Sequence, residues 1–199
     1  MNLLRHLLRG AAAGAAGTTA LNVVTYADMV VRGRPASSTP TDTVEALSRR
    51  TGLRIPGDAR RRANRLDGLG PLAGLAAGVG TGLVLGAARS AGWRPAGGSS
   101  FAAATVAALL VGNGPMTLLG ITDPRTWDVD AWATDLLPHL AYGAATAYVL
   151  TGLDHDDDGP MKRPAAAGAR RRQRASSSSS SLASDDAGTP ARAAASKRR

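Results

Sequence analysis

The feature that most constrains this chain is a series of glycines spaced four residues apart: Gly70, Gly74, Gly78, Gly82 and Gly86. Residues four apart stack along one face of an α-helix, so these glycines would line a smooth groove. In water such a helix is poor, because each interior glycine costs about 1 kcal/mol relative to alanine. In a bilayer, small residues let a second helix backbone come close, and packing replaces the hydrophobic drive that lipid cannot supply. The pattern therefore predicts a glycine-zipper helix inside a membrane protein.

Four windows of the chain carry no charge, if His139 is neutral, and they cover residues 10–27, 68–88, 95–122 and 136–153. About 20 apolar residues cross the ~30 Å hydrocarbon core of a bilayer. The windows therefore predict membrane-spanning helices over about 7–31, 68–91, 99–121 and 132–153. The predicted fold class is an all-α membrane protein, a four-transmembrane-helix bundle formed by residues 1–153. We expect a multi-pass protein of the cytoplasmic (inner) membrane.

The composition argues against a water-soluble domain and against several kinds of chemistry. Phe101 is the only phenylalanine, and a soluble core of this size would be hard to fill with so few aromatic side chains. The tryptophans lie beside the apolar windows, where amphipathic rings favour the membrane–water boundary: Trp93, Trp127 and Trp132. The absence of cysteine excludes disulfides, iron–sulfur clusters and thiolate metal sites. No phosphate-binding loop, dinucleotide fingerprint, nucleophile elbow or zinc pattern is present, so we expect no enzyme activity, no cofactor and no metal.

The net charge of +9 comes almost entirely from arginines, and these flank the apolar windows. Anionic lipid headgroups attract such residues, so the expected partners are the lipid bilayer and its anionic headgroups. A second copy of the chain or another membrane protein is a further partner that the packing surface leaves open. Nucleic acid is the alternative that basic charge allows, and we do not expect it. The arginines divide almost evenly between the two sides, and the positive-inside rule favours cytoplasmic termini by a small margin.

A basic interfacial loop, residues 32–67, is predicted between the first two spans. Within it, Asp42 and Glu45 have the spacing of a capping box, and Gly52 can close the short helix that follows them. This helix is amphipathic and would lie on a headgroup surface. Asp58 is a second helix-start signal, and it leads through an arginine-rich stretch toward the glycine-rich helix.

Two further segments are predicted to depart from regular helix. Gly112–Pro115 should kink or break the third span, because proline removes a backbone hydrogen bond and clashes with the preceding turn. Residues 154–199 are of low complexity and are predicted to be a disordered tail. The tail begins with Asp154–Gly159, which matches the first half of a calcium loop, but Ala165 stands where the bidentate acid belongs. We therefore interpret the acidic run as a solvated boundary after the last span.

Polar side chains that would lie within the spans form a candidate cluster: Asn22, Tyr26, Asn113, Asp135 and His139. Asp135 and His139 are four residues apart, on one face of the last helix. Ionisable residues inside a membrane usually face protein or a water-filled cavity, so a proton relay or a polar ligand site is one interpretation. The other is packing, with Asp135 at the helix start and the histidine and asparagines hydrogen-bonded between helices. We favour packing.

The order of these features resembles a known family. The first span ends in Val31-Arg32-Gly33-Arg34-Pro35, the sequence G-P-M-T-L-L-G covers residues 114–120, and D-L-L-P-H-L-A-Y-G enters the last span at residues 135–143. From about residue 7 to residue 153 the chain resembles the YagU-like group of small bacterial inner-membrane proteins. The resemblance implies a four-span inner-membrane protein without a defined biochemical activity.

The sequence thus predicts an integral membrane protein of unknown biochemical role, acting as a non-enzymatic structural or interaction component. One alternative is a small transporter or proton-linked channel component that uses the polar cluster, and another is an intramembrane enzyme. Convergence of Asn22, Asn113 and His139 on a wet cavity would favour transport, whereas separate helix contacts would favour packing.

Overall fold

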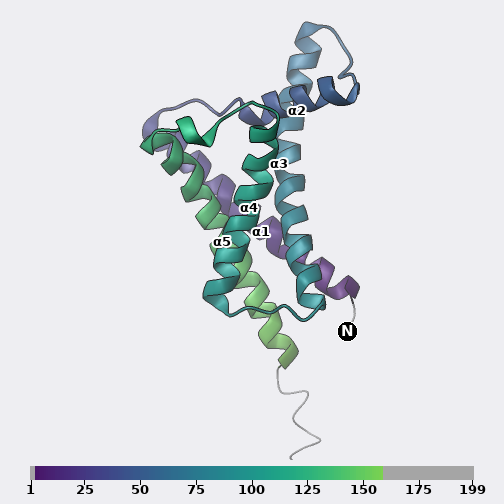
Figure 1. Ribbon diagram of the computed structural model, residues 1–199, viewed down its shortest axis with the longest axis vertical. Helices are drawn as coiled ribbons and strands as arrows, with labels where there is room; N and C mark the ends of the chain where they lie inside the picture. The colour runs from purple at the N-terminus through teal and green to yellow at the C-terminus, as the bar shows by residue number, and fades with distance from the viewer. Residues whose placement is uncertain (1–2, 159–199) are drawn as a thin grey trace, which may run out of the picture. The chain divides into compact units, whose positions relative to one another are not determined.

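The computed structural model describes residues 3–158, and within that range the chain is all-helical (Figure 1). The helices are α1 (Leu3–Arg32), α2 (Thr39–Thr51), α3 (Ala59–Ser90), α4 (Gly97–Leu118) and α5 (Val129–Asp158), with a short 3-10 helix η1 (Pro124–Thr126) before α5. The account below concerns the compact unit that ends at His155. The predicted all-α class is confirmed, and each predicted span overlaps one of the four long helices α1, α3, α4 and α5.

The long helices α1 and α3 run antiparallel, because their contacts pair early residues of one with late residues of the other (Figure 1). Gly10 lies against Gly82 and Gly86, and Gly14 lies against Gly78 and Gly82. The short helix α2 packs across the first part of α3, where Thr41 meets Gly70. Helix α2 therefore packs on the arginine-rich half of α3, and α1 packs on its glycine-rich half.

The ends of α2 and α3 show which start and stop signals the sequence carries. The positive φ of 74° at Gly52 ends α2, as predicted. The capping-box spacing of Asp42 and Glu45 predicts too late a start for α2. The helix begins right after Ser38, because its first turn accepts Pro40. Asp58 caps α3 as predicted, and its side chain accepts a hydrogen bond from the Arg61 N–H at 2.8 Å. The last part of the predicted loop is consequently helical, and α3 continues through Pro71.

The predicted break at Gly112–Pro115 is wrong, because helix α4 continues through these residues and ends at Leu118. Helix α5 continues to Asp158, so the predicted tail begins too early and the start of the acidic run is helical rather than a calcium loop. Asp154 stays in the helix because its carboxylate pairs with the buried Arg89 at 2.9 Å. The rest of the predicted tail, residues 159–199, lies outside the described residues.

The interior of the bundle is built from small residues. Its buried apolar cluster consists of Ala13, Ala104 and Ala108 with three larger side chains, Leu85, Tyr142 and Leu150. Buried hydroxyls lie beside them: Thr18, Thr81, Ser100, Thr105 and Thr146. Many of the large aliphatic side chains point outward instead, with Val30 82% and Leu118 81% exposed.

Two helices, α3 and α4, are long and apolar enough to cross a membrane. Only 22% of the most apolar 18-residue stretch of α3 is buried, and only 17% of that of α4. Most residues of these two stretches are therefore at least partly exposed among the described residues. Among residues 3–158 no other helix reaches the same length and hydropathy, so the structure supports two membrane-crossing helices by composition rather than the predicted four.

Candidate functional site

Three of the five predicted polar side chains come together between α4 and α5, and Asn113, Asp135 and His139 are called the polar cluster below. The Asn113 Nδ2 amide donates to Asp135 Oδ2 at 2.8 Å. The His139 Nδ1 atom lies 2.7 Å from the backbone carbonyl of Asp135 and 3.6 Å from its Oδ1 atom. Because a carbonyl oxygen can only accept, Nδ1 carries the proton of this bond. The three side chains thus join the end of α4 to the start of α5.

This arrangement leaves two polar atoms that no described residue hydrogen-bonds. When Nδ1 of a neutral histidine is protonated, Nε2 is an acceptor. In His139 the Nε2 atom faces Gly112, where an added Cβ would lie 3.2 Å from it. The Oδ1 atom of Asn113 is buried and has no hydrogen-bond partner within residues 3–158. The cluster therefore presents two acceptors, which could take a hydrogen bond from a water or from a protonated group.

The other two predicted members do not join this cluster. Asn22 is partly buried and makes no hydrogen bond to any described residue. Tyr26 is 58% exposed. Nearby on α1, Asp28 binds Arg34 at 2.5 Å and lies 3.7 Å from Arg32, so it serves the end of its own helix. The convergence of Asn22 with Asn113 and His139 that would favour transport is not observed.

The predicted packing glycines fall into three groups. A Cβ added at Gly78, Gly82 or Gly86 would overlap atoms of α1, including the carbonyl oxygens of Gly10 and His6. A Cβ at Gly70 would meet Thr41 of α2 at 3.0 Å, and one at Gly74 would meet nothing within 4 Å. The sequence periodicity placed these residues on one face but could not show that different neighbours use different parts of it.

Tyr142 and Thr146, one and two turns after His139, reach the centre of the bundle. The Tyr142 hydroxyl donates to the Gly78 carbonyl at 2.7 Å, and the Thr146 hydroxyl donates to the Ala13 carbonyl at 3.3 Å. A Cβ at Gly17 would overlap both side chains. These contacts tie α5 to α3 and α1 at the level where those helices come closest.

Sequence reasoning missed a buried ionic site at the opposite end of α5. The Arg89 side chain is 2% exposed, and its Nε donates to Asp154 Oδ2 at 2.9 Å. Its Nη2 donates to the Ser100 hydroxyl at 2.9 Å, which in turn donates to the Pro95 carbonyl at 3.0 Å. The sequence offered one signal, which is that Arg89 directly follows a long charge-free window. An arginine that ends a helix at the surface has the same position, so this signal does not indicate burial.

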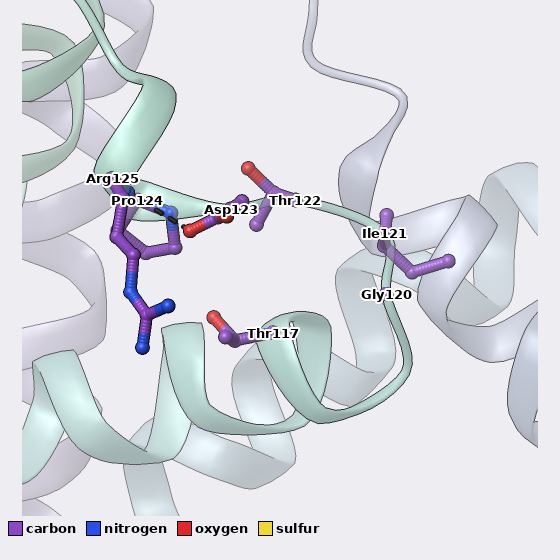
Figure 2. A pocket seen from close by; sticks show the side chains of 7 residues that line it. All are labelled: Thr117, Gly120, Ile121, Thr122, Asp123, Pro124 and Arg125. Atoms are coloured by element: carbon purple, nitrogen blue, oxygen red, sulfur yellow. Dashed lines mark hydrogen bonds between the residues drawn. The ribbon is translucent and has the colours of Figure 1, made fainter.

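The connection between α4 and α5 contains a hollow of about 520 Å³, lined by Thr117 and by residues 120–125 (Figure 2). Figure 2 shows Asp123 turned toward the backbone of Arg125, and its Oδ1 accepts from that N–H at 3.0 Å. The Thr122 hydroxyl accepts from the Trp127 indole at 2.7 Å. Both polar side chains therefore hold the turn together. Within residues 3–158 no three histidine or acidic side chains are placed to hold a metal ion.

Comparisons of the chain with protein-family models, with curated proteins and with solved structures find no match.

Proposed function

We propose that this chain is a multi-pass integral membrane protein, that α1, α3, α4 and α5 all cross the inner membrane, and that its role is structural or as an interaction component rather than enzymatic. The observation that carries the proposal is the distribution of side-chain size. Glycine, alanine and threonine fill the interior, while leucine and valine cover the outside. The resemblance to YagU-like proteins leads to the same expectation.

This distribution is the reverse of what water selects. In a soluble protein, leucine, valine and isoleucine are among the residues most often buried, and contiguous exposed apolar surface marks contact with another phase or partner. Here Leu110 is 67% exposed near the middle of α4, and Val84 is 69% exposed in α3. In hydrocarbon these side chains cost nothing, and close packing of small residues provides the attraction between helices.

Helices α1 and α5 fit this proposal where their polar groups are satisfied inside the bundle. The Thr18 hydroxyl donates to the Gly14 carbonyl of its own helix at 2.8 Å. The Tyr142 and Thr146 hydroxyls donate to carbonyls of neighbouring helices. Polar groups satisfied within the bundle do not face lipid. We propose that Gly78, Gly82 and Gly86 act as the glycine zipper that brings α1 alongside α3.

The chain has no cysteine, so single cysteines can report which residues lie in lipid. A Leu110→Cys variant should react with a membrane-impermeant maleimide only after detergent is added. A Thr126→Cys variant, in the α4–α5 connection, and a Leu3→Cys variant should react from opposite sides of intact vesicles. The protein should stay with the membranes in alkaline carbonate. Labelling of Leu110→Cys without detergent, together with release into carbonate, would overturn the membrane proposal.

A second candidate function, proton or solute transport, is favoured by one observation, the two unpartnered acceptors of the polar cluster. The structural role predicts that sealed vesicles holding the wild-type protein show no more proton flux than empty vesicles. A flux that the wild type carries and that is lost in His139→Gln and Asp135→Asn, with the helix content unchanged, would replace the structural role by transport.

A further inference from the structure

A groove of about 510 Å³ lies between α2, the segment that follows it and the first half of α3. Figure 1 shows α2 placed against this part of α3. The lining includes two arginines, Arg54 and Arg65, and four leucines, Leu47, Leu53, Leu69 and Leu72. The groove is within the size range of small-molecule sites.

The charged part of the groove has a local excess of positive charge. Residues 32–67 contain nine arginines and four acidic residues, a difference of +5. Three of these acids have other partners, since Glu45 pairs with Arg62 at 2.7 Å and Arg49 at 3.2 Å, Asp58 caps α3, and Asp42 accepts from Ser38. Arg54 makes no ion pair with any described residue. An anion placed in the groove would therefore meet a guanidinium that no described carboxylate neutralises.

The apolar part of the groove is open rather than filled. Leu53 is 74% exposed and Leu72 is 60% exposed. Arg65 and Leu72 are seven residues apart on α3, which is about 10 Å along a helix axis. The depth from the phosphates of a bilayer to the upper part of its acyl chains agrees with this spacing to within a few ångströms. Along α3 the arginine thus comes before the leucine, in the same order as the phosphate and the acyl chains of a phospholipid.

We propose that this groove binds one anionic diacyl phospholipid, with its phosphate at Arg54 and Arg65 and an acyl chain along Leu53, Leu69 and Leu72. The inference rests on the proposed membrane location, since it requires Leu72 to lie at the edge of the hydrocarbon. Arg65 already donates to the Pro56 carbonyl, which fixes its guanidinium beside the groove. The positive rim favours an anionic lipid over a zwitterionic one, and the leucines favour a whole lipid over a free phosphate.

The test is native mass spectrometry of the delipidated full-length protein in neutral detergent, titrated with phosphatidylglycerol, phosphatidylcholine or glycerol 3-phosphate. One phosphatidylglycerol should bind at least tenfold more tightly than phosphatidylcholine, and glycerol 3-phosphate should not compete. The double variant Arg54→Gln and Arg65→Gln should bind phosphatidylglycerol on the order of tenfold more weakly. The double variant Leu53→Ser and Leu72→Ser should bind both lipids more weakly. It should still fold, because both side chains are already exposed.

The matched control is Arg50→Gln with Arg60→Gln, which removes the same charge from exposed arginines that do not line the groove. It should change phosphatidylglycerol binding by less than twofold. An equal loss in this control would show a diffuse basic surface, and equal binding of the two lipids would show no site; either overturns the proposal. A lipid-free dimer in place of the lipid complex would assign the groove to a second copy. These results leave the membrane proposal standing, which only carbonate release and cysteine labelling can overturn.

Discussion

Arg89 is the largest side chain that the bundle buries almost completely, and its charge is balanced by one carboxylate, that of Asp154. Moving an ion pair out of water is costly, and the attraction between the partners offsets that cost only when both are present with good geometry. Removing one partner leaves an uncompensated buried charge, which destabilises the fold more than replacing both partners by apolar residues. The pair joins residues 65 positions apart and so holds the end of α5 to α3 and, through Ser100, to α4.

Asp154→Asn should therefore lower the free energy of unfolding by about 3 kcal/mol, the typical effect of breaking a buried pair. Asp130→Asn is the control, because Asp130 is 80% exposed and lies 3.9 Å from Arg32, a geometry worth less than about 1 kcal/mol. Thermal unfolding in detergent micelles measures both. Substituting both members, Arg89→Met with Asp154→Leu, should recover most of the loss. Equal small losses in the two single variants would contradict the role assigned to Arg89.

At this scale the sequence predicted contacts within one helix better than contacts between helices. The four-residue spacing of Asp135 and His139 placed them together, and they lie together. Asn113 joins them only because the α4–α5 connection returns the chain at the right level, which spacing along the sequence does not encode. Asn22 is also a polar residue in an apolar window, but it makes no hydrogen bond to these residues.

Among the elements, α3 carries the sharpest contrast between positions that look alike in the sequence. Gly82 and Gly74 belong to the same four-residue series, yet the first lies against the α1 backbone and the second is open. A methyl group costs nothing where there is space, and alanine is the better helix former by about 1 kcal/mol. Where two backbones touch, the same methyl group forces the helices apart.

Gly82→Ala should therefore destabilise the bundle, and Gly74→Ala should leave its stability unchanged or raise it by up to about 1 kcal/mol. An added Cβ at Gly82 would be 2.6 Å from the Gly14 Cα atom, closer than real packing allows. Unfolding in detergent micelles, followed by circular dichroism, gives both values. Gly78→Leu and Gly82→Leu should also cost more than Leu83→Ala. If Gly82→Ala and Gly74→Ala change the stability by the same amount, α1 and α3 do not pack as described.

An ion pair that acid can remove joins α2 to α3. Arg62 donates to Glu45 at 2.7 Å, and this hydrogen bond, with the charges of Arg62 and Arg49, lowers the pKa of Glu45 below its ordinary value of 4.5. A lowered folded-state pKa means that the stabilisation is complete above the ordinary value and is lost as the pH falls through the lowered one.

Spin labels at Thr51→Cys and Asn64→Cys, both exposed positions, report the separation of α2 and α3. The distance distribution should be narrow at neutral pH and broaden as the pH drops below the ordinary glutamate value of 4.5. With Glu45→Gln the distribution should already be broad at neutral pH and change little on acidification. A wild-type distribution that stays narrow at low pH would show that apolar contacts alone hold α2.

Element boundaries were predictable where a local residue imposes them. Gly52 and Asp58 act through their own φ angle and side chain, so their effects can be read without the fold. The end of α5 was not predictable, because Asp154 remains helical through a partner that is remote in sequence. Gly112–Pro115 was misleading because a proline removes only its own N–H from the helix, and α4 continues past it to Leu118.

For the whole molecule, charge-free windows located all four long helices, because the length and polarity of a segment are properties of the sequence alone. Which faces meet is a property of pairs of segments. The small residues of α1, Gly10 and Gly14, indicated a partner surface for the glycines of α3, but the antiparallel alignment and the division of those glycines between α1 and α2 came only with the structure.

The contact of Gly10 with Gly82 has a consequence for how the protein is made. At synthesis rates of 5–20 residues per second, the ribosome needs roughly 4–14 s to add the residues between them. During that interval α1, which contains no stretch as apolar as those of α3 and α4, lacks the surface that covers its glycines and threonines. If α1 crosses the membrane as proposed, the insertion machinery must hold it for some seconds, and a pause in translation before α3 would lengthen that exposure.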